Sequence, residues 1–284
     1  LKVQVGDKGA GLMSLYDLRA ERELLWQGDP TWWGHRSPLL FPIVGSLACG
    51  AFTYEGKSYE QPTHGFAREK VFSCKKADPT RILHELCSDD ETRAVYPFDF
   101  ALQVTHSLEA NTLHIEWDVR NTGESTMYFS IGAHPAFFCP LEAGEQIEDC
   151  AVDFHTDGPI YRRLLDAKTS RVFPGQREVP LKHGRMALSA HTFDERAIVL
   201  DDIPFDKLSL CGRNGKPYVT LHFPGFPYAG IWSPPGAPFV CLEPWFGRCN
   251  EMEASNELVE RPGMMSLAAG QSWHAGYDIE AEPA

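Results

Sequence analysis

The sequence predicts an all-β protein built as an antiparallel sandwich. Short runs of alternating apolar and polar residues dominate the chain, and 21 prolines and 24 glycines interrupt them. Alternation with a period of two is typical of a strand with one buried and one solvated face. Helical patterns are few, at 90–95 and within 252–260. Many short strands between turn residues favour hairpin connections over βαβ units.

The first part of the chain contains two expected strands, at 1–5 and 12–18, followed by a proline-rich segment at 38–45. Pro38 and Pro42 exclude a helix interior and a central ladder position there, because proline has no backbone N–H. We therefore expect an edge or loop segment laid against the core.

Further on, residues 52–59 predict a hairpin, and 113–120 alternate apolar and polar residues without error. Asn214-Gly215 lies between two alternating runs, which is the strongest short hairpin signal. Additional strands are expected at 127–133, 208–211 and 218–223.

Composition bounds the size and partners of the protein. The 284 residues are 43% hydrophobic, and no linker, charge block or repeat divides them, so we expect a single domain over 1–284. The formal charge of −13 argues against nucleic acid or a membrane as partner, since both need clustered cations. Eight scattered cysteines without a CxxC pair, no transmembrane stretch and no visible signal peptide indicate reduced thiols and a cytoplasmic location.

Glu243 is the most informative residue. Residues 239–243 form a predicted buried strand that Pro244 ends, and Glu243 shares one face of it with Phe239 and Cys241. A buried carboxylate without a partner loses its hydration. Either a cation pairs with Glu243, or its raised proton affinity serves chemistry.

Two histidines are candidates for the same chemistry. Alternation places His134 on one face with Ser130 and Gly132, where small residues leave space for a ligand. A structural histidine at a strand end is the equally weighted alternative. His64 lies in a turn, and in an extended segment it points the same way as Arg68. Taken alone, a loop histidine is more often simply solvated.

Arg36 is either a solvated surface cation or a fork of donors for sugar hydroxyls or a phosphate. Four tryptophans lie in loops or beside proline. Core packing is their commoner use, but aromatic platforms also hold pyranose rings. These are Trp32, Trp33, Trp232 and Trp245.

The chain has no HExxH, GxxxxGK[ST], GxSxG or GxGxxG motif. Spacing leaves a His/His/Glu metal site open, because strands bring distant residues together.

Taken together, several segments resemble the aldose 1-epimerase (galactose mutarotase-like) superfamily, and they are most similar to its LacX-like branch. The similarity extends over nearly the whole chain. The segments are 36–45, 64–68 (His-Gly-Phe-Ala-Arg), 132–137 (Gly-Ala-His-Pro-Ala-Phe), 231–233 and 237–245.

The resemblance implies a β-supersandwich with a cleft in one concave sheet. It implies Glu243 as catalytic base and His134 as catalytic acid, with His64 assisting. Sugar binding would fall to Arg36, Arg68, Trp232 and Trp245. One departure concerns 193–197, where Arg196 occupies a position at which relatives carry an acidic sugar ligand. The identity of the sugar is therefore open.

The expected function is interconversion of the α and β anomers of a hexose by ring opening, with no metal and no organic cofactor. A base removes the O1 proton while an acid protonates the ring oxygen, and Glu⁻ with HisH⁺ provides both. One alternative is a hexose-6-phosphate 1-epimerase that uses Arg36 and Arg68 on the phosphate. Another is a non-catalytic sugar-binding protein of the same fold. The oligomeric state is not predicted.

Overall fold

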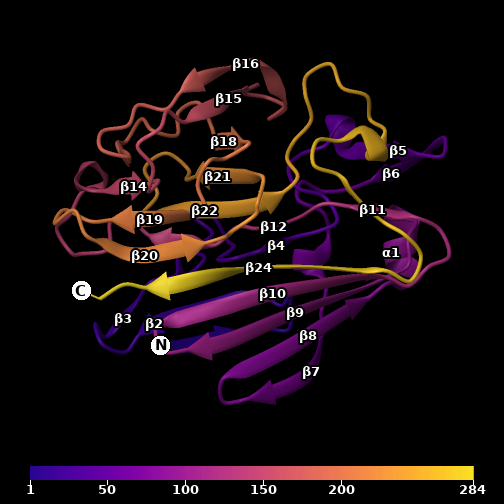
Figure 1. Cartoon of the computed structure of the whole chain (residues 1–284), viewed down its shortest axis with the longest axis horizontal. Helices are drawn as coiled ribbons and strands as arrows, with labels where there is room; N and C mark the ends of the chain where they lie inside the picture. The colour runs from indigo at the N-terminus through magenta and orange to yellow at the C-terminus, as the bar shows by residue number, and fades with distance from the viewer. Residues whose placement is uncertain (284) are drawn as a thin grey trace.

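The computed structural model describes residues 1–283, which form two large antiparallel sheets stacked as layers (Figure 1). The first has nine strands among the described residues. In spatial order they are β17 (Arg185–Ala187), β14 (Ala151–Asp153), β19 (Lys207–Cys211), β20 (Pro217–His222), β24 (Ser272–Ala281), β10 (Thr112–Asn121), β9 (Phe100–Glu109), β8 (Arg81–Cys87) and β7 (Ser73–Asp78).

The second sheet carries the segments singled out in the sequence. In spatial order its strands are β16 (Val172–Glu178), β15 (Tyr161–Leu165), β18 (Ile198–Asp201), β21 (Tyr228–Trp232), β22 (Phe239–Phe246), β12 (Ile131–Ala133) and β4 (Leu39–Leu40), and β13 (Ala136–Phe138) also pairs with β22.

Smaller pieces complete the fold. They are a three-stranded sheet of β1 (Lys2–Val5), β2 (Leu12–Asp17) and β3 (Arg22–Glu23), the hairpin of β5 (Ala51–Tyr54) and β6 (Lys57–Glu60), the pair β11 (Met127–Phe129) and β23 (Met265–Leu267), the α-helix α1 (Asp90–Val95), and four 3-10 helices, η1 (Ala48–Gly50), η2 (Ala67–Glu69), η3 (Ile147–Asp149) and η4 (Leu258–Glu260). The predicted all-β antiparallel fold with few short helices is confirmed.

A continuous apolar core contains side chains from both large sheets. The alternation of β10 buries its apolar residues there, and Val240 and Leu242 of β22 join the same cluster. Phe239 and Cys241 lie in a separate cluster, on the opposite face of β22. The alternation predicted for β22 is thus confirmed, and both of its faces are buried. No described helix is both long and apolar enough to cross a membrane.

Three sequence expectations need correction. Pro244 does not end its strand, since β22 continues to Phe246. On one side, β22 pairs with β13 through 239–241 and with β12 through 245–246. Pro244 falls between these two ladders, where the strand does not need a backbone N–H donor. The expected strand 127–133 is broken at Ser130 into β11 and β12, which pair with different strands. The helical pattern within 252–260 yields only the short η4.

Candidate active site

His134 and Glu243 meet at the base of a cavity. His134 Nε2 lies 3.0 Å from Glu243 Oε2, and the residues are only 6% and 1% exposed. Sheet register explains the contact. Gly132 lies opposite Trp245, and Ala136 lies opposite Cys241, so the intervening residues of the 132–136 segment face the middle of β22. Segments more than 100 positions apart thereby bring an imidazole against the buried carboxylate.

Burial governs the protonation of this pair. It raises the pKa of Glu243 well above the ordinary value, and burial together with the neighbouring His64 lowers the pKa of His134 well below its ordinary value. Both directions favour uncharged groups over the Glu⁻/HisH⁺ arrangement expected from the sequence. The two arrangements differ only in which group holds one proton, and the pair is neutral overall in either.

His64 is held in one orientation by its turn. Its Nδ1 accepts a hydrogen bond from the Gly45 backbone N–H at 3.1 Å, so a neutral His64 carries its proton on Nε2. Gly65 is required in this turn, because its φ is +72° and an added Cβ would lie 2.3 Å from the Phe41 carbonyl oxygen. Burial lowers the pKa of His64 to about 3. The His64 and His134 ring centroids are 5.5 Å apart.

Two tryptophans surround the imidazole of His134. The Trp33 ring stacks on it at 4.8 Å between centroids, and Trp232 approaches edge-on at 5.7 Å. Trp33 is positioned by its own loop, where the indole N–H of Trp26 donates to the Trp33 carbonyl oxygen at 2.9 Å. These rings form an aromatic wall beside the polar pair.

Trp245 occupies the space that the sequence analysis assigned to a ligand. A Cβ added to Gly132 would lie 2.5 Å from Trp245 Cδ1, and one added to Gly230 would lie 2.3 Å from Cη2. Ser130 is also engaged elsewhere, since its hydroxyl accepts from the Val44 N–H and donates to the Pro42 carbonyl oxygen. Gly132 and Gly230 therefore leave room for the Trp245 indole and not for a ligand. The open space is a cavity that Trp245 helps to line.

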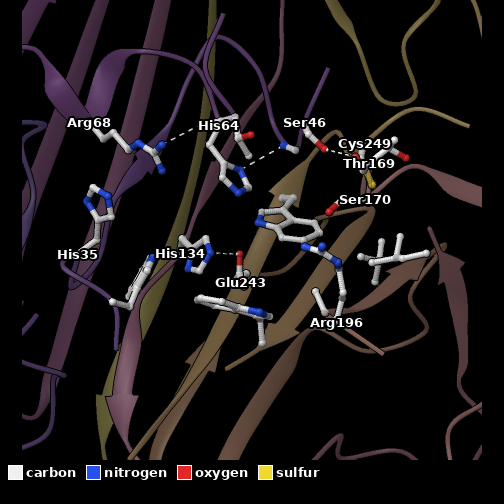
Figure 2. A pocket seen from close by; sticks show the side chains of 18 of the residues that line it. His35, Ser46, His64, Arg68, His134, Thr169, Ser170, Arg196, Glu243 and Cys249 are labelled. Carbon is white, nitrogen blue, oxygen red and sulfur yellow. Dashed lines mark hydrogen bonds and ion pairs between the residues drawn. The ribbon is translucent and has the colours of Figure 1, made fainter. Parts of the chain in front are cut away.

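That space is a cavity of about 630 Å³. Figure 2 shows Arg68 and His35 on one side of the His134–Glu243 pair, and Arg196, Thr169 and Ser170 on the other. Sequence reasoning missed several polar residues of the lining. They are His35, Ser46, Lys168, Thr169 and Ser170.

The predicted sugar-binding residues divide into two groups. Arg68, Trp232 and Trp245 line the cavity, whereas Arg36 does not. The Arg36 guanidinium donates to the backbone carbonyls of Met13 at 2.6 Å and Gln27 at 3.1 Å. These two bonds hold the Arg36 guanidinium outside the cavity and use two of its five N–H donors. Its expected contact with a sugar or phosphate stays a prediction that the lining of the cavity does not support. Arg68 donates one bond, to the Thr63 carbonyl oxygen at 3.0 Å.

One group of side chains has the composition of a metal site. Donor atoms of His134, Cys241 and Glu243 all lie within 4.8 Å of one another, and all three residues are buried. Nitrogen, sulfur and oxygen ligands suit Zn²⁺. Burial raises the pKa of the Cys241 thiol well above its ordinary value, which opposes formation of the thiolate that a metal requires.

With this fold and site, the chain belongs to the aldose 1-epimerase family, whose profile matches residues 1–279. It is 30% identical over 296 residues to the plasmid-encoded protein LacX of Lactococcus lactis subsp. lactis, covering 98% of this chain and 96% of that protein. Within the wider superfamily the chain thus falls in the LacX-like branch.

Solved structures agree with this assignment. A galactose mutarotase related enzyme from Lactobacillus acidophilus superposes with a TM-score of 0.93 at 32% identity, over 99% of this chain and 94% of that one. A galactose mutarotase-like protein from Lactobacillus casei ATCC 334 gives a TM-score of 0.91 at 26% identity, over 99% and 96%. The galactose mutarotase-like fold implied by the sequence resemblance is confirmed.

Proposed function

We propose that the protein is an aldose 1-epimerase that interconverts the anomers of a hexose by acid/base-catalysed ring opening. The observation that carries the proposal is the 3.0 Å contact between buried His134 and Glu243 at the wall of a sugar-sized cavity. Family membership supports a sugar substrate and isomerase chemistry.

The reaction needs one proton acceptor and one proton donor around a single carbon. Glu243 takes the O1 proton while His134 protonates the ring oxygen, which opens the pyranose to the free aldehyde. Rotation about C1–C2 presents the other carbonyl face, and the reversed transfers close the ring as the other anomer. A positioned acid and a positioned base each contribute about 100- to 10,000-fold in rate.

The His134–Glu243 pair returns to its starting protonation state after each turnover. Ring opening converts Glu⁻/HisH⁺ into the uncharged GluH/His form, and ring closure restores the first form. Burial favours the uncharged form. In the empty cavity the pair therefore rests uncharged, and because the two groups touch, proton transfer from Glu243 to His134 provides the charge-separated form before a sugar reacts.

The remaining lining residues orient the sugar. Neutral His64 offers its Nε2–H as a donor beside His134, and Arg68 offers guanidinium donors on the same side of the cavity. Trp33 and Trp232 supply flat apolar surfaces for the C–H faces of a pyranose.

The test is polarimetry of freshly dissolved glucose, galactose and glucose 6-phosphate with catalytic amounts of protein. We expect faster relaxation to the equilibrium rotation for at least one aldose, with no other reactant added. A sugar that raises the melting temperature but relaxes at the uncatalysed rate would instead make this a sugar-binding protein of the same fold.

A further inference from the structure

Cations outnumber acids in the lining of the cavity, although the protein as a whole carries a formal charge of −13. Arg68, Lys168 and Arg196 all line the cavity. One of these cations, Arg68, lies 3.8 Å from Glu69. Among the described lining residues the one carboxylate is Glu243, whose pKa burial raises. The field of distant surface acids is screened beyond about 8 Å at physiological ionic strength, so these local cations determine what the cavity attracts.

Two of the cations lie together on one side of the catalytic pair. Lys168 belongs to the loop that follows β15, and Arg196 lies two residues before the start of β18 and reaches toward the cavity (Figure 2). Neither forms an ion pair with any acid in the described range 1–283. The acid next to Arg196 in sequence, Glu195, pairs with Arg177 at 2.6 Å and with Arg162 at 3.9 Å.

Hydrogen bonds within the loop around Lys168 hold its conformation. The Asp166 carboxylate accepts bonds from the backbone N–H groups of Lys168 and Thr169 and from the Thr169 hydroxyl. Ser46 donates to the Thr169 carbonyl oxygen at 3.0 Å, which joins the loop to another segment of the cavity lining. The loop thus presents Lys168 and Ser170 to the cavity in a defined arrangement.

Arg196 also has a structural contact, because its guanidinium donates to the Ala167 carbonyl oxygen. That bond uses one of five N–H donors and leaves the others for a ligand. It also ties Arg196 to the loop of Lys168, so the two cations are held on one wall. A planar guanidinium beside an ammonium and a hydroxyl suits an oxyanion group.

Resting on the proposed function, we propose that the substrate is an aldose bearing an anionic group remote from C1, and that Arg196 and Lys168 bind that group. The chemistry shared by its sources is a tetrahedral or planar oxyanion: a phosphate, a sulfonate or a carboxylate. The anomeric carbon lies at Glu243 and His134 while the anion reaches Arg196. This subsite differs from the one that sequence reasoning built on Arg36 and Arg68.

The first experiment compares kcat/KM for mutarotation of glucose, glucose 6-phosphate, 6-deoxyglucose 6-sulfonate and glucuronate. We expect one anionic sugar to exceed glucose by about 10- to 100-fold, the range of charge-assisted hydrogen bonds. The three anions identify which oxyanion is preferred. Added salt should slow the anionic substrate and leave glucose unaffected, since screening acts on charge alone.

Variants then locate the effect. In Arg196→Gln and in Lys168→Gln, the ratio of anionic to neutral kcat/KM should fall about tenfold, and Arg196→Lys should retain part of it. The matched control is Arg120→Gln, an exposed arginine on β10, which should leave the ratio unchanged. Arg196→Gln could lower the ratio only because the loss of the Arg196–Ala167 bond loosens the loop. Lys168→Gln keeps that bond and therefore tests the subsite without this effect. A ratio near one, unchanged in both variants, overturns the proposal.

A binding measurement separates this inference from the catalytic one. Calorimetric titration of the wild type and of Glu243→Gln with glucose 6-phosphate, glucose and inorganic phosphate reports the subsite without turnover. If no aldose is isomerised, the proposed function fails, yet anion binding that is lost in Arg196→Gln still supports the subsite. If glucose is isomerised but no anionic sugar binds more tightly than glucose, the subsite alone fails.

Discussion

Strands β10 and β22 lie in different sheets and use their polar residues in opposite ways. On β10, the polar side chains that precede the buried Asn121 lie on the outer face, where His114 contacts Asp278 at 2.7 Å. On β22, seven of eight residues are buried, and the one carboxylate among them contacts an imidazole whose pKa burial lowers. The first strand follows the rules for a stable sheet, and the second departs from them at a single residue.

The difference identifies Glu243 as a position at which the side chain lowers the stability of the folded state. An uncompensated buried carboxylate is expensive, and a hydrophobic residue at position 243 would pack without that penalty. A ladder of this fold does not require a buried acid, since the carboxylates of β10 lie on its outer face and its buried polar residue, Asn121, is an uncharged amide. The buried pair is therefore best explained by chemistry.

The largest expected effect comes from exchanging the carboxylate on each strand. Glu243→Gln should slow mutarotation by at least about 100-fold, because the amide keeps the shape and loses the base. Glu116→Gln, at an exposed position of β10, is the matched control and should leave the rate unchanged. Polarimetry measures both, and circular dichroism checks folding. Full activity of Glu243→Gln would remove this residue as the base.

A pH–rate profile sharpens the contrast between buried and solvated pairs. Burial and His64 lower the pKa of His134 well below 6.5, so a second proton joins the pair only on the acid side of that value. Burial raises the pKa of Glu243 well above 4.5, so the last proton leaves only well to the alkaline side of that value. We expect a broad bell in kcat/KM, with a plateau around neutral pH.

His64, whose pKa is about 3, should remain neutral throughout and contribute no limb at neutral pH. His64→Asn is the check, since it should lower the plateau without introducing a new limb. An acid limb at or above 6.5 would mean that His134 titrates like a solvated imidazole. A flat profile would argue against the paired acid and base.

Packing against β22 gives a smaller effect, on stability. Gly230→Ala should destabilise the protein by about 1–3 kcal/mol, the usual cost of overpacking, because the new Cβ would lie 2.3 Å from the Trp245 ring. Gly158→Ala is the control, with its nearest neighbouring atom 3.6 Å from the added Cβ. Urea denaturation measures both. Equal stability of the two variants would show that the Trp245 ring can shift to make room for the added methyl group.

The smallest expected effect is that of a chelator. Mutarotation should survive EDTA, because the proton transfers assigned to His134 and Glu243 need no metal. Removal of a third donor by Cys241→Ala should likewise leave the pH profile unchanged. Activity that is lost on chelation and restored by Zn²⁺ would instead assign the His134–Cys241–Glu243 group to a metal.

Local pattern was enough for much of the fold. Alternation and turn residues correctly predict strands β10 and β19, the hairpin of β5 and β6, and helix α1. Prediction failed where pairing decided the outcome. Pro244 continues its strand because it falls between two ladders, and Ser130 divides its strand because its neighbours pair with different partners.

For the site, the sequence by itself determined the chemical types: a carboxylate in an apolar strand, a histidine beyond small residues, and an arginine where an acid was expected. Only the tertiary structure decided which of them meet. It placed His134 against Glu243, turned Arg36 onto backbone carbonyls, and added Trp33, Lys168 and Ser170 to the cavity. The physical reason is that strand periodicity fixes the face of a residue, whereas register and loop closure over long sequence separations fix its neighbours.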